Sequence, residues 1–428
     1  MGLPGGPLTI PRLPGPVRGD WAVPGSKSIT NRVLVLAALA EGRSVVENVL
    51  VSDDTAHMRS GLEALGIGLA DGAPGQILID GGRSRLRAPG HELFCGNSGT
   101  TIRFLAAVAA LVPGEVRLVG DAHMAARPIA DLVEGLRALG VAVDCPTGCP
   151  PLTIHGGRFP GGRIPLRADR SSQYLTALLL VAALGDSDLE VELAGELVSR
   201  PYVEMTRRLV ADFGGLVEEV PGGFRARRCA NYQGRGFRVE PDASAASYPF
   251  ALAALGHDLT VPGLGQRTLQ GDHGFVALLA RMGAAVQVGA IQTRVQAGAA
   301  LCGLDCDMHH ISDTVMTLAA IAPLATGPTT IRNVANIRIK ECDRLLATVN
   351  GLRGLGQEVE HGDDWLRIVP RGLRPATVDC QHDHRLAMSF AILGAATGVV
   401  TIDDPACVAK TYPGFWDDLA ALYPARPW

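Results

Sequence analysis

A repeated unit of roughly 70 residues constrains this chain most, because six copies of it account for nearly the whole sequence. Each copy opens with polar residues, continues into an Ala/Leu-rich stretch, and usually passes through Gly into β-branched residues. A polar start followed by an apolar stretch predicts a helix with a polar N-terminus, and such N-termini attract phosphate and carboxylate. The six openings lie at residues 24–32, 96–103, 171–174, 242–247, 310–313 and 383–385.

The second half of each copy predicts another helix and two strands. Apolar residues at helical spacing end in Gly in five copies, which indicates amphipathic helices with a C-cap. These segments are 58–66, 132–140, 205–214, 275–283 and 345–356. Short β-branched runs follow, such as 141–143 and 152–154, separated by turn residues. The unit is therefore predicted as helix–strand–helix–strand–strand.

Six copies divide most simply into two lobes of three, with the boundary near Glu240–Pro241. Strands are also expected at 8–10 and 21–23, and they could pair with either half. We expect one lobe at residues 23–240 and the other at residues 1–22 plus 241–428. A cleft between two such lobes would collect helix N-termini from both, so we expect the active site there.

Composition excludes several classes of protein. The net charge of −4 gives no general attraction to nucleic acid or membranes. No apolar run reaches the roughly 20 residues of a membrane helix, and the Gly/Pro-rich start lacks a signal peptide's apolar centre. The nine cysteines include no CxxC pair, which favours reduced thiols in the cytoplasm over a disulfide or zinc site.

Cationic side chains gather at the starts of the copies, although the chain as a whole is mildly acidic. Arg offers a planar fork for carboxylate or phosphate, and Lys a compact charge. Each cation alone could be a solvated surface charge, but their equivalent positions favour an anion site. The set is Lys27, Arg32, Arg103, Arg127, Lys340, Arg344, Arg385 and Lys410. Lys340 and Arg344 are four residues apart, which predicts a shared helix face.

Other polar residues have two interpretations each. Ser171 and its neighbours could cap a helix, bind phosphate, or do both. Asp313 is either the N-cap of the fifth copy's first helix or an acid–base group, and Glu341 is a proton carrier or an ion-pair partner. His384 polarises a ligand or satisfies a backbone group. Without any Walker, Rossmann or HExxH motif, these residues predict an enzyme for a small molecule with at least two anionic groups.

Together the motifs resemble the enolpyruvyl transferase family over about residues 8–420. They are 24–32, 96–100 with Arg103, 127–129, 171–173, Asp313, 340–344 and 383–388. The resemblance implies an α/β fold of two pseudo-symmetric lobes built from six inverse βαβαββ repeats. It also implies closure of the lobes around substrate.

The implied reaction transfers the enolpyruvyl group of phosphoenolpyruvate to the 5-hydroxyl of shikimate 3-phosphate and releases phosphate by addition–elimination. This step belongs to chorismate and aromatic amino acid biosynthesis and is the target of glyphosate. The family resemblance implies a cytoplasmic monomer whose partners are these two small molecules, with no cofactor, metal, nucleic acid or membrane.

The resemblance also assigns site residues. Asp313, Glu341 and Lys27 would be catalytic: Asp313 takes the hydroxyl proton, and Glu341 or Lys27 moves the proton at C3 of phosphoenolpyruvate. Shikimate 3-phosphate would contact Lys27, Ser28, Arg32, Ser171, Ser172, Gln173, Ser199, Tyr202, Asp313, Asn336 and Lys340. Phosphoenolpyruvate would contact Lys27, Asn97, Gly99, Arg127, Gln173, Arg344, Arg385 and Lys410.

Some positions depart from the family pattern. His123 and Ala125 stand where many relatives carry a cation, Phe104 follows Arg103, and Leu386 replaces a usual Met. These departures leave open a paralogous transferase with a different phosphorylated acceptor. The branch acting on UDP-N-acetylglucosamine typically has a Cys in the second copy's loop, and 120–126 contains none. A non-enzymatic scaffold would predict loss of the three catalytic residues, which are all present.

Overall fold

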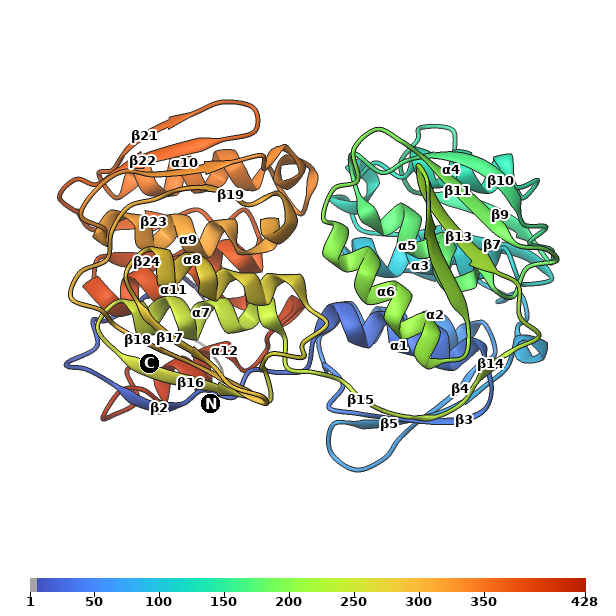
Figure 1. Cartoon of the computed structure of the whole chain (residues 1–428), viewed down its shortest axis with the longest axis horizontal. Helices are drawn as coiled ribbons and strands as arrows, with labels where there is room; N and C mark the ends of the chain where they lie inside the picture. The colour runs from blue at the N-terminus through green and yellow to red at the C-terminus, as the bar shows by residue number, and fades with distance from the viewer. Residues whose placement is uncertain (1–5) are drawn as a thin grey trace. The chain divides into compact units, whose positions relative to one another are not determined.

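The chain forms two compact units, shown in the computed structural model of Figure 1, in which residues 6–428 are described. Unit 2 is the continuous stretch Gly25–Glu240. Unit 1 combines the segment that ends at Pro24 with Pro241–Trp428, so both ends of the chain belong to it.

Unit 2 contains three copies of a βαβαββ unit. The first consists of α1 (Lys27–Leu39), β3 (Ala40–Glu47), α2 (Asp53–Ala64), β4 (Gly68–Asp71) and β5 (Gln76–Gly81), with β14 (Tyr232–Gln233) and β15 (Gly236–Arg238) beside β3. The second consists of β6 (Leu93–Phe94), α3 (Gly99–Ala109), β7 (Gly114–Val119), α4 (Ala130–Ala138), β8 (Ala142–Asp144) and β9 (Leu152–Gly156). The third consists of β10 (Gly162–Arg167), α5 (Ser172–Ala182), β11 (Leu189–Ala194), α6 (Arg200–Asp212), β12 (Leu216–Val220) and β13 (Gly223–Arg227).

Unit 1 repeats this plan. Its first copy has β2 (Arg18–Asp20), α7 (Ala243–Ala254), β16 (Asp258–Pro262), α8 (Phe275–Arg281), β17 (Ala285–Val288) and β18 (Gln292–Gln296). The next has β19 (Asp305–Asp307), α9 (Val315–Ile321), β20 (Thr329–Arg332), α10 (Arg344–Gly354), β21 (Glu358–His361) and β22 (Leu366–Val369). The last has β23 (Ala376–Val378), α11 (His384–Thr397), β24 (Val400–Ile402) and α12 (Phe415–Ala420), with β1 (Leu8–Thr9) paired to β24.

Short 3₁₀ helices connect several of these elements. They are η1 (Arg83–Arg85), η2 (Met124–Ala126), η3 (Gly271–Gly274), η4 (His309–Thr314), η5 (Ala322–Leu324), η6 (Ala335–Ile339) and η7 (Pro405–Lys410).

Each full copy makes its own small sheet with the same strand order. In the third copy the order is β10-β11-β13-β12, with β10 parallel to β11 and the other pairs antiparallel. Val191 on the second strand lies opposite Ile164 on one side and Phe224 on the other, so apolar residues share one face. The predicted helix–strand–helix–strand–strand order is confirmed in five copies, each with a leading strand or strands beside its first β-strand. The sixth copy has no strand pair after α12, and β1 from the start of the chain pairs with its β24 instead.

The leading strands of the first copy in each unit come from distant sequence. In unit 2 they are β14 and β15, which follow the third copy, and in unit 1 it is β2. The strand predicted at 21–23 is wrong in position: β2 ends at Asp20, and beyond it the Trp21 backbone N–H donates to the Thr260 carbonyl. The strand predicted at 8–10 is present as β1.

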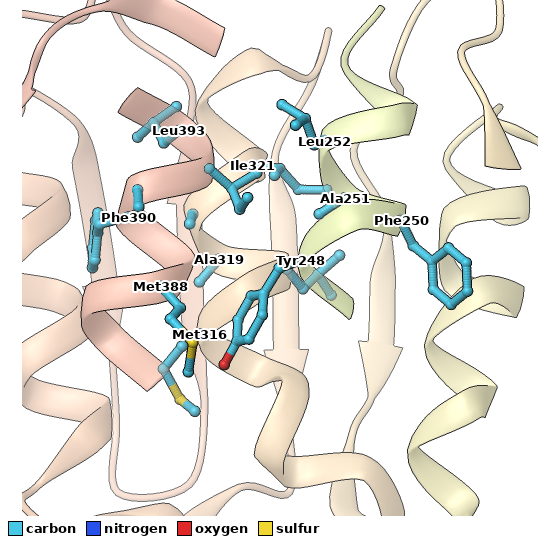
Figure 2. Close-up of a cluster of buried hydrophobic side chains, with 14 of the residues drawn as sticks. Tyr248, Phe250, Ala251, Leu252, Met316, Ala319, Ile321, Met388, Phe390 and Leu393 are labelled. Atoms are coloured by element: carbon cyan, nitrogen blue, oxygen red, sulfur yellow. The ribbon is translucent and has the colours of Figure 1, made fainter. Parts of the chain in front are cut away.

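The first helix of each copy forms the core of its unit. Every residue of α3 and of α7 is buried, and most of these residues are small or apolar. In unit 1, side chains of α7, α9 and α11 meet, among them Tyr248, Met316 and Met388 (Figure 2). Among residues 6–428, no helix is long and apolar enough to cross a membrane.

Candidate functional site

The N-terminus of α1 carries the first predicted cation. Ser26 caps this helix through its side-chain oxygen, which accepts from the Ile29 N–H. Lys27 is the first helical residue, and its Nζ lies 3.3 Å from Oδ2 of Asp54, a buried carboxylate at the start of α2. A helix N-terminus and a lysine together give this position a local positive field.

Arg32 is a buried guanidinium held without a carboxylate. Its Nε donates to Thr206 Oγ1 at 2.8 Å and its Nη1 to the Ser28 carbonyl at 2.8 Å. The rings of Phe104 and Tyr202 lie 5.4 and 5.7 Å from the guanidinium carbon. Burial lowers the pKa of Arg32 to about 10, and no carboxylate of the described residues forms an ion pair with it. Burial of a cation without a charged partner costs free energy, and an anion bound beside it would offset that cost.

Asn97, Gly99 and Arg127 come together at the start of α3. Arg127 Nη1 donates to the Asn97 backbone carbonyl at 3.2 Å and to its Oδ1 at 3.1 Å. A Cβ on Gly99 would lie 2.6 Å from Arg127 Nη2. Glycine is therefore required for the guanidinium to lie against the helix N-terminus, which Ser98 caps.

The N-terminus of α5 adds hydroxyl and amide groups. Ser171 is its N-cap and accepts from the Gln173 N–H, which confirms the predicted capping role. Gln173 Oε1 accepts from Arg103 Nη1 at 2.6 Å, and its Nε2 donates to Thr100 Oγ1 at 3.2 Å. Arg103 thereby connects α3 to α5 and fixes the orientation of the Gln173 amide.

Ser199 and Tyr202 lie at the start of α6. Ser199 immediately precedes this helix with a left-handed backbone, φ 51°. Tyr202 presents its ring to Arg32 and its backbone carbonyl to Thr206 Oγ1. Unit 2 thus contains eleven of the predicted ligand residues: Lys27, Ser28, Arg32, Asn97, Gly99, Arg127, Ser171, Ser172, Gln173, Ser199 and Tyr202.

In unit 1, Arg344 is the centre of a buried ionic cluster. Its Nε lies 2.7 Å from Asp383 Oδ2, and its Nη2 lies 2.6 Å from Glu341 Oε2. Its Nη1 lies 3.3 Å from Asp313 Oδ1. Burial by itself would lower the pKa of Arg344, but the three carboxylates outweigh it and raise that pKa. Arg344 is consequently a permanent cation.

Asp313 contacts three cations, and of its two interpretations the N-cap of α9 is wrong. It lies in η4, and Thr314 precedes α9 instead. Besides Arg344, Arg385 Nη2 lies 2.8 Å from Asp313 Oδ2 and Lys340 Nζ lies 3.8 Å from Oδ1. The Asp313 carboxylate is therefore directed at the three cations.

The predicted helix face shared by Lys340 and Arg344 is wrong. Asp343 caps α10 and Arg344 is its first residue, so Lys340 lies in the connection before the helix. Both cations still reach the Asp313 carboxylate. Asn336 lies in η6 and donates its Nδ2 to Ser312 Oγ at 3.0 Å, and Lys410 ends η7.

The departures from the family pattern have local explanations. Phe104 is fully buried with its ring beside Arg32. Leu386 is fully buried in α11, where a change between Met and Leu nearly conserves volume. His123 precedes η2 with its side chain 55% exposed, 4.0 Å from the Asp121 carboxylate.

Asp54 is a site residue that sequence reasoning missed. It contacts Lys27 directly and is only 3% exposed. The local sequence signal was Ser52-Asp-Asp-Thr55, which predicts a helix start. Ser52 and Thr55 form a capping box that fixes the first turn of α2, where Asp54 lies. Nothing in the sequence alone shows that this helix start faces Lys27.

These groups define a class of protein that binds small anionic molecules through clustered guanidinium, ammonium, hydroxyl and helix N-terminal groups. Among residues 6–428, no three His, Cys, Asp or Glu side chains are arranged to hold a metal ion. The nine cysteines are all free thiols.

Comparisons with known proteins identify the family. The pattern of the EPSP synthase (3-phosphoshikimate 1-carboxyvinyltransferase) family matches residues 11–419. A 3-phosphoshikimate 1-carboxyvinyltransferase from Nostoc sp. is 43% identical over 96% of this chain and 97% of its own length. One from Serratia proteamaculans is 42% identical over 95% of this chain and 96% of its own. The chain belongs to the EPSP synthase family.

Solved structures agree with the fold. EPSP synthase from Acinetobacter baumannii superimposes with a TM-score of 0.82 at 25% identity, covering 98% of this chain and 99% of the other. The enolpyruvyl transferase NikO from Streptomyces tendae has the same fold, with a TM-score of 0.78 at 19% identity and 98% of each chain covered. The predicted enolpyruvyl transferase fold is therefore confirmed.

Proposed function

We propose that this chain transfers the enolpyruvyl group of phosphoenolpyruvate to the 5-hydroxyl of shikimate 3-phosphate and releases phosphate. The observation that carries the proposal is the Asp313 carboxylate, which is held by Arg344, Arg385 and Lys340 within a member of this family. A carboxylate among cations suits a reaction that moves a proton while negative charge passes to departing phosphate.

Unit 2 supplies most of the groups assigned to the acceptor. Arg32, the α1 N-terminus with Lys27 and Ser28, and the capped start of α5 offer donors to the 3-phosphate and ring hydroxyls. Ser199 and Tyr202 extend this set, and unit 1 adds Asp313, Asn336 and Lys340. The buried Arg32 without a carboxylate partner among the described residues supports an anionic ligand here.

Phosphoenolpyruvate is assigned to cations of both units. Arg127, Asn97, Gly99, Gln173 and Lys27 come from unit 2, and Arg344, Arg385 and Lys410 come from unit 1. Because Asn97 and Gly99 fix the Arg127 guanidinium, its fork is ready for a carboxylate or phosphate. The proposal requires both units to present these groups to the same pair of substrates.

The chemistry proceeds by addition and then elimination. Asp313 accepts the proton of the 5-hydroxyl as that oxygen bonds to C2 of phosphoenolpyruvate, and C3 receives a proton. A lysine ammonium group is a donor with three N–H bonds, so Lys27 suits its delivery. The C2–O bond to phosphate then breaks while C3 loses a proton. Glu341, a carboxylate paired with Arg344, suits its removal.

Phosphate release tests the proposal. Purified protein is incubated with phosphoenolpyruvate, with and without shikimate 3-phosphate, and the product is identified by mass. Release that depends on shikimate 3-phosphate, with an enolpyruvyl adduct, is the expected result. Folded protein that binds phosphoenolpyruvate yet releases no phosphate with this acceptor would contradict it and point to a different phosphorylated acceptor.

A further inference from the structure

The turn that ends in Lys410 is held at both ends by the last helix of the chain. At its start, Trp416 Nε1 in α12 donates to the Pro405 carbonyl at 2.7 Å. Just after Lys410, the Tyr412 hydroxyl donates to Asp418 Oδ2 at 2.6 Å, also in α12. The same hydroxyl accepts from Trp21 Nε1 at 2.9 Å.

These contacts lie in a buried aromatic cluster. Tyr412 and Trp416 are each 2% exposed, and Phe415 is fully buried between them. The Phe415 ring lies 5.7 Å from the Tyr412 ring and 5.0 Å from that of Trp416, both edge to face. Such rigid anchors leave little freedom to the short turn attached to them.

The backbone transmits this anchoring to Lys410. The N–H groups of Thr411 and Tyr412 both donate to the Val408 carbonyl, at 3.1 and 2.8 Å. Lys410 lies inside this hydrogen-bonded turn, with Tyr412 only two residues away. A shift of the Tyr412 ring would therefore displace the Lys410 backbone.

Asp418 is a half-buried carboxylate for which the proposed reaction has no use. Burial raises its pKa, and the hydrogen bond from Tyr412 acts in the opposite direction. Its described partner is the Tyr412 hydroxyl, so its role is to hold that hydroxyl in place. The adjacent Asp417 faces outward and pairs with Arg426.

We propose that Tyr412, Trp416 and Asp418 are positioning residues that fix Lys410 where it meets phosphoenolpyruvate. The inference rests on the proposed function, since it takes Lys410 as a phosphoenolpyruvate cation. The C-terminal helix α12 then acts on the reaction without touching either substrate.

Steady-state kinetics of Tyr412→Phe and Trp416→Phe tests the inference, because each change removes one anchoring hydrogen bond and keeps an aromatic ring at the position. The KM for phosphoenolpyruvate is expected to rise about tenfold while the KM for shikimate 3-phosphate stays within about twofold of wild type. Tyr423→Phe is the matched control, since its hydroxyl donates to Pro11 rather than to the Lys410 turn. It should change neither KM.

A second pair of variants separates an effect on the position of Lys410 from a general loss of protein stability. Asp418→Asn keeps an oxygen that accepts from Tyr412 and should retain the wild-type KM for phosphoenolpyruvate, whereas Asp418→Ala should raise it. All assays are run well below the lowest measured melting temperature. A wild-type KM for phosphoenolpyruvate in Tyr412→Phe, Trp416→Phe and Asp418→Ala overturns the inference.

Lys410→Ala separates this inference from the proposed function. If wild type fails to turn over the two substrates, the proposed function fails. If wild type is active but Lys410→Ala leaves the KM for phosphoenolpyruvate unchanged, the assignment of Lys410 is wrong and the positioning inference is overturned with it. If only Lys410→Ala raises that KM, the anchors do not position the residue.

Discussion

At the scale of single residues, the arginines assigned to ligands are held differently in the two units. In unit 1, Arg344 and Arg385 pair with carboxylates, and Asp313 accepts from both. In unit 2, Arg32 and Arg127 are held by hydroxyl, carbonyl and amide groups, and no carboxylate of the described residues pairs with either. Unit 2 therefore has cationic charge to offer an anion, while unit 1 has a carboxylate to accept a proton.

Asp313→Asn is expected to keep ligand affinity and lose turnover by a factor of about 10² to 10⁴, because the amide cannot accept the hydroxyl proton. Calorimetric titration gives the affinity and phosphate release gives the rate. Asp307→Asn is the control: it lies in the same segment, is exposed, and accepts from the His309 N–H. Near-normal turnover of Asp313→Asn would remove Asp313 as the base.

Gly99→Ala should raise the KM for phosphoenolpyruvate about tenfold, because the new Cβ would lie 2.6 Å from Arg127 Nη2 and displace the guanidinium. The KM for shikimate 3-phosphate should change far less. Gly90→Ala meets no atom within 4 Å and serves as control. Equal effects on both KM values would mean that Gly99 only supports the helix start.

At the scale of elements, the repeated sequence pattern made most of the fold predictable. Polar caps before apolar stretches located α1, α3, α5, α7 and α11 correctly, since Ser and Asp side chains do cap these helices. In the fifth copy the N-cap interpretation of Asp313 is wrong, because the 3₁₀ turn η4 lies between the polar residues and α9. The contact of Lys27 with Asp54 is a tertiary one, and no local spacing encodes it.

The N-terminal strand of unit 1 depends on a neutral histidine. Val17, just before β2, donates its N–H to His257 Nδ1 at 3.0 Å, and burial lowers the pKa of His257. The native state thus binds fewer protons than the unfolded chain. This contribution to stability is present above the unfolded pKa of about 6.5 and is lost as pH falls toward the folded pKa.

His257→Asn is therefore expected to flatten the loss of thermal stability between about pH 7 and 5, because the amide oxygen can accept from Val17 without titrating. Differential scanning calorimetry at several pH values measures this, with a difference of about 2–4 °C expected. Asp258 titrates lower, since Arg294 holds its pKa down. The same pH slope in wild type and variant would contradict the assignment.

At the scale of the whole molecule, the two units differ in which segments of the chain form them. Unit 2 is a single continuous segment, whereas unit 1 needs both ends of the chain. Strand β1 pairs with β24, and the bonded side chains of Thr9 and Thr401 are 392 positions apart. Contacts so distant in sequence form late, because closing the long loop between them costs conformational entropy before the contacts can stabilise it.

Pulse-labelled hydrogen exchange during refolding should therefore protect amides of β7, β9, β11 and β13 before those of β24. Ile10, whose N–H donates to the Val400 carbonyl, reports the last sheet directly. Simultaneous protection of both groups would show that the two units fold as one.

The same chain order has a consequence in the cell. A ribosome that adds about 5–20 residues per second needs roughly 20–80 seconds to pass from β1 to β24. During that time unit 2 can finish, while Leu8, Ile10 and Trp21, all buried in the finished protein, lack their partners. The segment from Leu8 to Trp21 is therefore the stretch on which a chaperone holding unfinished chains would act.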